Sequence, residues 1–119
     1  KDGAIIYHCS EGKDRTGIVT VLILYLLGVD METIRQDYLY SNYMLDNYRA
    51  SRDKIMQENG ENLCFRANMR ILGSVSDAFL DTSLIAIHKN FGSLDNYLKE
   101  IIGVTPELRD TLRELYLED

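Results

Sequence analysis

One short apolar run is the only part of the sequence that favours a β-strand, and it stands before an otherwise helical pattern. Ala4–Tyr7 has the length and composition of a buried strand. A single buried strand cannot form a sheet, because its backbone N–H and C=O groups need partners. We therefore expect a mostly helical α/β fold with one buried strand. Its partner strands would come either from a preceding segment or from a second copy of the chain.

Helical patterns fill the rest of the sequence. An apolar run without breakers, from Arg15 or Thr16 to Leu27, predicts a buried helix that ends at Gly28. Further helices are expected at 31–42 after Asp30 with a continuation to Gly60, either unbroken or after a break, at 62–72, at 77–91 after Ser76, at 93–102, and from Pro106 after Thr105. Three of these segments follow an Asp, Ser or Thr, which are residues that cap helix N-termini.

Size and composition narrow the classes of protein that the chain can belong to. Its 119 residues fit at most one domain, and the net charge of −6 argues against a nucleic-acid partner. The longest apolar run, Ile18–Leu27, is too short to span a membrane, so no stable membrane insertion is expected. Cys9 and Cys64 are too few for a disulfide framework, which favours reduced thiols. We expect a cytoplasmic protein, with a secreted effector as the alternative left open.

The most informative segment lies between the predicted strand and the first helix. It runs His8-Cys9-Ser10-Glu11-Gly12-Lys13-Asp14-Arg15-Thr16-Gly17. Gly12 and Gly17 permit tight turns, and successive backbone N–H groups in such a loop can point inward. The helix that follows adds its own free N–H groups at its N-terminus. The spacing therefore predicts a cup for a tetrahedral oxyanion such as phosphate.

The side chains of this loop suggest nucleophilic chemistry on a phosphate ester. Cys9 is the candidate nucleophile, because a helix N-terminus can lower a thiol pKa to roughly 3.5–7.5. Arg15 carries a planar guanidinium that can hold two phosphate oxygens. Thr16 could donate its hydroxyl to the sulfur, and His8 is expected to orient the loop rather than act as a base. The predicted phosphate-binding residues are Ser10, Glu11, Gly12, Lys13, Asp14, Arg15 and Thr16.

A leaving oxygen also needs a proton donor. Asp14 is the first candidate for this general acid, and Glu11 is the second. The alternative for Asp14 is a carboxylate that pairs with a cation and braces the loop. Lys13 is expected at the rim of the cup, where it could bind a second phosphate or an acidic substrate; its alternative is a solvated surface lysine.

The string from His8 to Gly17 resembles the active-site loop of the protein tyrosine phosphatase superfamily, which shares the pattern HCxxGxxRT or HCxxGxxRS. The ending Gly-Lys-Asp-Arg-Thr-Gly is similar to that of the narrower bacterial tyrosine/serine phosphatase family. Residues 26–30, 37–42 and 91–98 also resemble segments of that family. The resemblance implies that residues 1–119 are the C-terminal part of a single phosphatase domain whose N-terminal sheet lies elsewhere.

The same resemblance implies a reaction. Cys9 would form a phosphocysteine intermediate without a metal or cofactor, Arg15 would bind the phosphate, and Asp14 would be the general acid. Lys13 matches a lysine linked to phosphoinositide recognition. The expected substrate partner is a protein carrying phosphotyrosine, with phosphoserine, phosphothreonine or a phosphoinositide next. The helices after Asp30 would resemble a lid near the site.

Two other functional classes fit part of the pattern. A phospho-binding or regulatory module without catalytic activity would keep the cup but release no phosphate. A sulfur-transfer enzyme of the rhodanese kind also uses a cysteine loop, but the ending Arg15-Thr16-Gly17 argues against it.

Residues outside the loop have more ordinary interpretations. Cys64 is expected to be structural. Arg49, Arg52 and Lys54 are expected to form a solvated face, with contact to a substrate or to a membrane surface as the alternative. The two cysteines and two histidines lack the spacing of metal ligands, so no metal site is expected.

Overall fold

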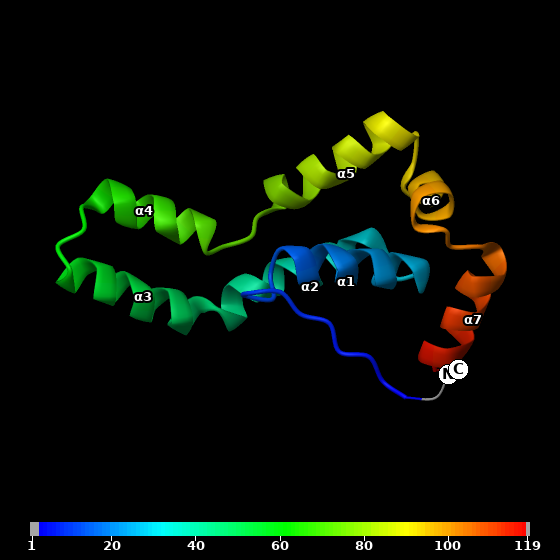
Figure 1. The fold of residues 1–119 in the computed structure, drawn as a ribbon, viewed down its shortest axis with the longest axis horizontal. Coiled ribbons are helices and arrows are strands. Elements are labelled where there is room, and N and C mark those ends of the chain that lie inside the picture. The colour runs from blue at the N-terminus through cyan, green and yellow to red at the C-terminus, as the bar shows by residue number, and fades with distance from the viewer. Residues whose placement is uncertain (1–2, 119) are drawn as a thin grey trace.

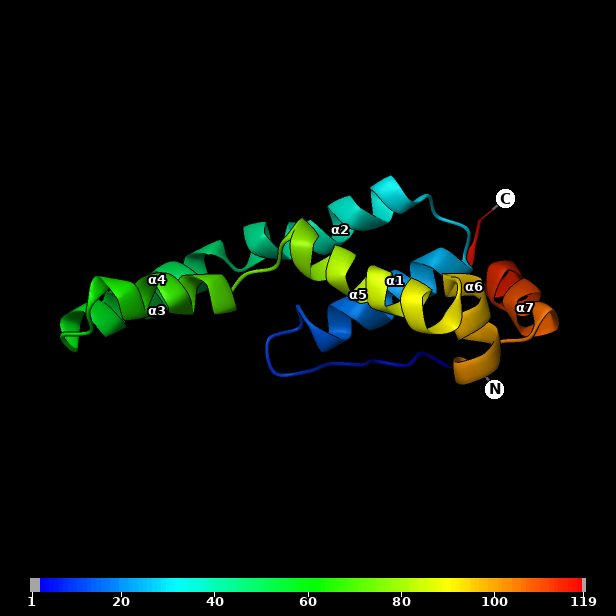
Figure 2. The same ribbon diagram turned by 90° about the horizontal axis from the view of Figure 1, so that it is seen from above.

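The computed structural model describes residues 3–118, and from Arg15 onward they form helices joined by short turns (Figure 1). In chain order the helices are α1 (Arg15–Leu26), α2 (Met31–Met44), α3 (Asp46–Glu58), α4 (Leu63–Leu72), α5 (Asp77–Phe91), α6 (Leu94–Tyr97), the π-helix η1 (Leu98–Ile102) and α7 (Pro106–Tyr116). The molecule is elongated, with extents of 56 × 35 × 22 Å. Its long axis arises from the hairpin of α3 and α4, which projects beyond the other helices in both views (Figure 1, Figure 2).

The predicted α/β fold class, with a buried strand at Ala4–Tyr7, is wrong. Residues 4–7 form an open chain without strand structure, and Ile5 and Ile6 are 86% and 90% exposed. The part of the chain that the structure describes, residues 3–118, contains no strand for this run to pair with. An apolar run records only a tendency toward burial, whereas a strand also requires a neighbouring backbone.

The helix starts follow the capping residues that the sequence indicated. The side chains of Asp30, Ser76 and Thr105 each accept a hydrogen bond from the backbone N–H three residues on, which confirms all three predicted caps. Asn62 and Ser93 cap α4 and α6 in the same way. Each cap satisfies an N–H group that the helix itself leaves without a partner.

The break that the sequence left open between residue 31 and Gly60 lies at Leu45, where α2 ends and α3 begins. A polar network holds the two sides of this break. Arg49 of α3 donates to the side-chain and backbone oxygens of Asn42, both at 3.0 Å, and to the Gly73 carbonyl at 3.4 Å. The Asn42 amide in turn pairs with the backbone of Val75. Arg49 therefore ties the hairpin to α2 rather than lying on a solvated face.

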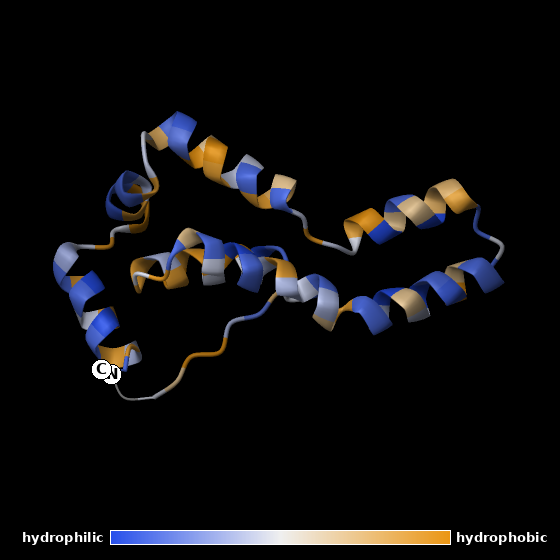
Figure 3. Cartoon of the chain, turned by 180° about the vertical axis from the view of Figure 1, so that it is seen from behind, coloured by the Kyte–Doolittle hydropathy of each residue, from blue (hydrophilic) through white to orange (hydrophobic). Residues whose placement is uncertain are grey.

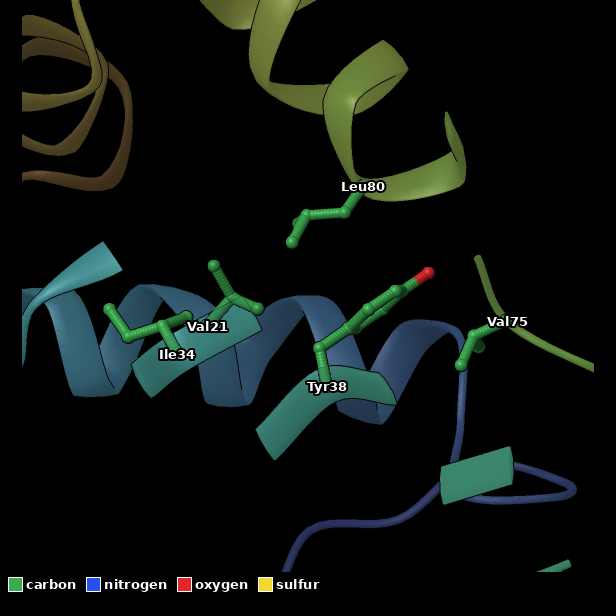
Figure 4. Close-up of a cluster of buried hydrophobic side chains, with 5 residues drawn as sticks. All are labelled: Val21, Ile34, Tyr38, Val75 and Leu80. Carbon is green, nitrogen blue, oxygen red and sulfur yellow. The ribbon is translucent and has the colours of Figure 1, made fainter. Parts of the chain in front are cut away.

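A small apolar core holds α1, α2 and α5 together (Figure 4). It consists of Val21 from α1, Ile34 and Tyr38 from α2, Val75 from the turn before α5, and Leu80 from α5. Ile34 and Leu80 have no exposed surface. Burying a side chain of this size contributes roughly 1.5–3 kcal/mol relative to leaving it in water.

The burial expected for the first helix is only partial. Val21 and Leu26 of α1 are buried, but Val19 and Ile23 remain about two-fifths exposed. Figure 3 shows that hydrophobic and hydrophilic residues alternate along the helices. Among residues 3–118, no single helix is long and apolar enough to cross a membrane. Only α4 and α5 taken together reach the length and hydropathy of a membrane span, and a bend of 52° separates them.

Two arginines of α7 fix the C-terminal end of α1. Arg109 and Arg113 each donate a hydrogen bond to the carbonyl of Leu26, at 3.3 and 3.0 Å. Arg109 also donates to the carbonyl of Tyr25 and lies over that tyrosine ring. These cations meet the carbonyls that a helix end leaves free and the negative end of its dipole. They hold α1 in place, and the loop that carries Cys9 is attached to its other end.

Candidate active site

The loop predicted to form a phosphate cup runs directly into α1. Residues 10–14 form a continuous bend, and α1 begins at Arg15. Gly12 has a φ of +75°, a backbone conformation that side chains with a Cβ rarely adopt. This turn brings the Gly12 N–H to 3.3 Å from Cys9 Sγ, toward which it donates. The glycine thus allows the loop to fold back over its own cysteine.

Cys9 lies in an environment that favours its thiolate. Its pKa is lowered from 9.0 to about 6, chiefly because the hydroxyl and then the backbone N–H of Thr16 donate toward the sulfur. The N–H groups of Gly12 and Glu11 add to this effect, while partial burial opposes it. The Thr16 hydroxyl is buried and has no other hydrogen-bond partner among the described residues, so it is available to the Cys9 thiolate.

Arg15 and Ser10 lie close together around the same loop. A terminal nitrogen of the Arg15 guanidinium lies 3.4 Å from Ser10 Oγ, across the loop that contains Cys9. Arg15 is exposed, as are Ser10 and His8. The cation is therefore accessible to an incoming anion near the cysteine, and its planar fork suits two phosphate oxygens.

Lys13 and Asp14 form a pair at the start of α1. Lys13 Nζ lies 2.5 Å from Asp14 Oδ2. The lysine is buried, at 4% exposure, whereas the Asp14 side chain is 59% exposed. In this arrangement Lys13 is not a solvated surface lysine. Asp14 would have to release this hydrogen bond before it could donate a proton to a leaving group.

Two contacts that the sequence did not indicate fix the loop on its neighbours. The Tyr7 hydroxyl bonds to Thr20 Oγ1 of α1 at 2.7 Å, and Thr20 donates to the carbonyl of Thr16 at 2.9 Å. Gly17 lies against the ring of Tyr38 in α2, where an added Cβ would come within 3.4 Å of ring carbons. The partners in these two contacts are 13 and 21 positions apart in the sequence. Their proximity depends on the fold, so no local sequence pattern could have indicated either contact.

Glu11 connects the loop to the helical hairpin. Its carboxylate lies 3.5 Å from a guanidinium nitrogen of Arg52 in α3. Glu11 also lines a pocket of about 70 Å³ between the loop, α3 and α4. Arg52, expected on a solvated face, thus contacts the predicted phosphate-binding loop. Cys64 is exposed on α4, where its sulfur lies 3.9 Å from the Asn68 amide nitrogen.

The described residues contain no group of His, Cys, Asp and Glu side chains arranged to hold a metal ion. The loop itself brings together one cysteine with a lowered pKa, the backbone N–H groups around it, one accessible arginine and the carboxylate of Asp14. These are the components that nucleophilic attack on a phosphate ester requires.

Comparison with known proteins finds one family that matches almost the whole chain and several similar relatives. Residues 1–118 match the family described as the tyrosine phosphatase family. A provisionally named tyrosine-protein phosphatase of Cupriavidus necator is 36% identical over 84% of the chain, and a tyrosine-protein phosphatase of Nostoc commune is 33% identical over 90%. A triple specificity protein phosphatase of Mycobacterium tuberculosis is 33% identical over 95%.

The chain spans only 36% to 44% of the length of these curated relatives. The match nevertheless includes nearly every residue of the chain, with the loop from His8 to Gly17 among them. The family that the loop residues indicated is thus confirmed by the whole sequence: the chain belongs to the tyrosine phosphatase family.

Proposed function

We propose that this chain carries the catalytic loop of a phosphatase that hydrolyses phosphate monoesters through a phosphocysteine at Cys9. The observation that carries the proposal is the lowered pKa of Cys9, about 6, which leaves the thiolate predominant at neutral pH. Membership of the tyrosine phosphatase family supports the same reaction class.

The first chemical step transfers the phosphoryl group to sulfur. The Cys9 thiolate attacks phosphorus, an S–P bond forms, and the bond from phosphorus to the ester oxygen breaks. Arg15 and the backbone N–H groups of the loop hold the phosphoryl oxygens. Asp14 gives its proton to the departing oxygen, which leaves as an alcohol or phenol.

The second step returns the enzyme to its starting state. Water attacks phosphorus and passes a proton to Asp14, while the S–P bond breaks and inorganic phosphate leaves. The Thr16 hydroxyl stabilises the thiolate that departs in this step. The same contact that lowers the Cys9 pKa thus makes the sulfur a better leaving group.

Phosphotyrosine in a protein is the substrate class that we propose first, because relatives of the chain are named tyrosine-protein phosphatases. Phosphoserine, phosphothreonine and phosphoinositides are proposed as further substrates. A binding module without turnover is the alternative, and the pairing of Asp14 with Lys13 is the observation that favours it. In that case the cup would bind phosphate, but the proton donor would stay engaged.

Release of inorganic phosphate from a small aryl phosphate tests the proposal. The full-length protein is assayed with EDTA present, beside Cys9→Ser and the matched control Cys64→Ser. The proposal expects turnover that resists EDTA, survives the Cys64 substitution and is abolished by the Cys9 substitution. Turnover that persists in Cys9→Ser would rule out Cys9 as the nucleophile. Phosphate binding without turnover would support the binding module.

A further inference from the structure

The hairpin of α3 and α4 places a positively charged pocket beside the catalytic loop. Its charged lining residues are Glu11, Arg49, Arg52, Asp53, Arg66 and Arg70. The four arginines and two carboxylates leave a formal excess of two positive charges, in a chain whose net charge is −6. The pocket is therefore a local site of attraction for an anion on a molecule that repels anions overall.

Two of the four arginines make hydrogen bonds that hold the helices together. Arg66 makes two hydrogen bonds to the carboxylate of Asp53, at 3.0 and 2.7 Å. These hydrogen bonds lower the pKa of Asp53 and raise the pKa of Arg66, so both groups stay charged. This pair joins α3 to α4. Arg49 is held by Asn42 and by the Gly73 carbonyl, with a side chain only 18% exposed.

The other two arginines are only loosely held. The Arg70 side chain is 68% exposed, and its one ion-pair partner among residues 3–118 is the Asp53 oxygen that Arg66 already occupies, at 3.4 Å. Arg52 is 47% exposed; it lies 3.5 Å from Glu11, donates to the exposed Tyr48 hydroxyl at 3.3 Å, and has the Tyr48 ring beneath its guanidinium. Exposed pairs at such distances contribute little, so an incoming carboxylate can replace these contacts.

The pocket adjoins the cysteine through Glu11. The Glu11 side chain lines the pocket, while its backbone N–H is one of the groups that lower the Cys9 pKa. Residues of an extended peptide follow one another at about 3.3 Å. Because Glu11 is two residues from Cys9 and 3.5 Å from Arg52, a peptide with a phosphotyrosine at Cys9 can place a side chain within a few residues of it near Arg52.

Building on the proposed function, we propose that Arg52 and Arg70 form an anion subsite that binds an Asp or Glu side chain of a phosphopeptide held at Cys9. A peptide suits the pocket better than a membrane does. The volume of the pocket, about 70 Å³, suits a single side chain. Met56 and Met69 in its lining can contact the methylene groups of an Asp or Glu side chain. The net charge of −6 would repel an anionic bilayer over the larger area that it presents.

The test compares phosphotyrosine peptides that differ only in charge. One set carries Glu at a single position within three residues of the phosphotyrosine on either side, and the other carries Gln there. Hydrolysis by the full-length protein is measured for the wild type, the double variant Arg52→Gln/Arg70→Gln, and Lys54→Gln. Lys54 is exposed on the same helix and does not line the pocket, so it controls for loss of charge alone.

The subsite predicts a preference for at least one Glu peptide over its Gln counterpart, carried mainly by KM and reduced as salt is raised. The double substitution should lower this preference about fivefold, the scale expected of exposed ion pairs. The Lys54 variant should keep it. A preference that is unchanged in the double variant, or equally reduced in Lys54→Gln, would overturn the subsite.

Two further measurements distinguish a failure of the subsite from a failure of the proposed function. Binding of the same peptides to Cys9→Ser reports on the subsite without turnover, and the aryl phosphate reports on catalysis without a second anion. If the aryl phosphate is not hydrolysed but Cys9→Ser still prefers Glu peptides through Arg52 and Arg70, the proposed function fails and the subsite stands. Sedimentation with phosphatidylserine or phosphoinositide vesicles that requires these arginines, without a peptide preference, would overturn the peptide in favour of a lipid headgroup.

Discussion

The hydroxyl of Tyr7 donates to Thr20 Oγ1 at 2.7 Å and so fastens the segment before Cys9 to α1. The direction follows from Thr20, whose own proton goes to the carbonyl of Thr16. The two ends of the loop are therefore linked through one side chain of α1. Cys9 lies between these anchor points, and Thr16, whose hydroxyl and N–H lower the Cys9 pKa, is itself one of them.

Tyr7→Phe should loosen this link while leaving the ring in place. We expect a loss of about 0.5–1 kcal/mol in the free energy of unfolding, as for one hydrogen bond, together with a higher Cys9 pKa. Urea unfolding and the pH dependence of Cys9 alkylation measure the two effects. Tyr40→Phe, at an exposed tyrosine of α2, is the matched control. An unchanged Cys9 pKa in Tyr7→Phe would show that the link does not position the loop.

The pH dependence of Cys9 follows from the direction of its pKa shift. Since the pKa is lowered from 9.0 to about 6, the thiolate predominates above about pH 6 and is lost as the pH falls through that value. The rate of alkylation by iodoacetamide should therefore fall to half near pH 6. Cys64, exposed on α4, provides an internal comparison within the same digest.

Thr16 is the first cause of this shift, so its substitution has a defined direction. Thr16→Val removes the hydroxyl and should move the alkylation midpoint of Cys9 to higher pH, whereas Thr16→Ser should keep it near the wild-type value. The pair of variants separates the hydroxyl from the shape of the side chain. Equal midpoints in the two variants would mean that the hydroxyl does not stabilise the thiolate.

The core under α1 depends on few side chains, and Leu80 is one of its two fully buried members. Leu80→Ala should destabilise the protein by about 2–5 kcal/mol, through lost burial and the cavity that remains. Ile85→Ala, at a position 65% exposed on the same helix, should change stability by less than about 0.5 kcal/mol. Similar losses in the two variants, measured by thermal unfolding, would contradict the assigned core.

The attachment of the hairpin can be tested at Arg49. Arg49→Met keeps an apolar stem but removes the hydrogen bonds to Asn42 and Gly73. We expect a loss of about 2–3 kcal/mol, since these are bonds from a charged donor in a partly buried position. Lys54→Met, on the same helix and exposed, should have little effect. Faster amide exchange in α3 and α4 of Arg49→Met would show that the loss lies in the hairpin.

Local signals in the sequence predicted much of this molecule. The caps at Asp30, Ser76 and Thr105 act within three residues of their own position, and the order Cys9 to Thr16 fixes a loop at a helix start. Such features depend on neighbouring residues alone, so the sequence contains them directly.

Features that depend on distant residues could not be read in this way. The strand predicted at residues 4–7 failed because strand formation depends on a neighbouring backbone. The role of Arg49 depends on Gly73, and the contact of Arg52 depends on Glu11, which is 41 positions earlier in the chain. The burial of Lys13 likewise depends on how the helices pack around the loop.

The central claim is that Cys9 becomes phosphorylated during turnover. The most direct measurement is to mix the full-length protein with an aryl phosphate, quench with acid within a turnover, and identify the modified peptide by mass spectrometry. We predict one phosphoryl group on Cys9 and none on Cys64. Turnover with no phosphoryl group on Cys9 at any quench time, or with one on another side chain, would contradict the account.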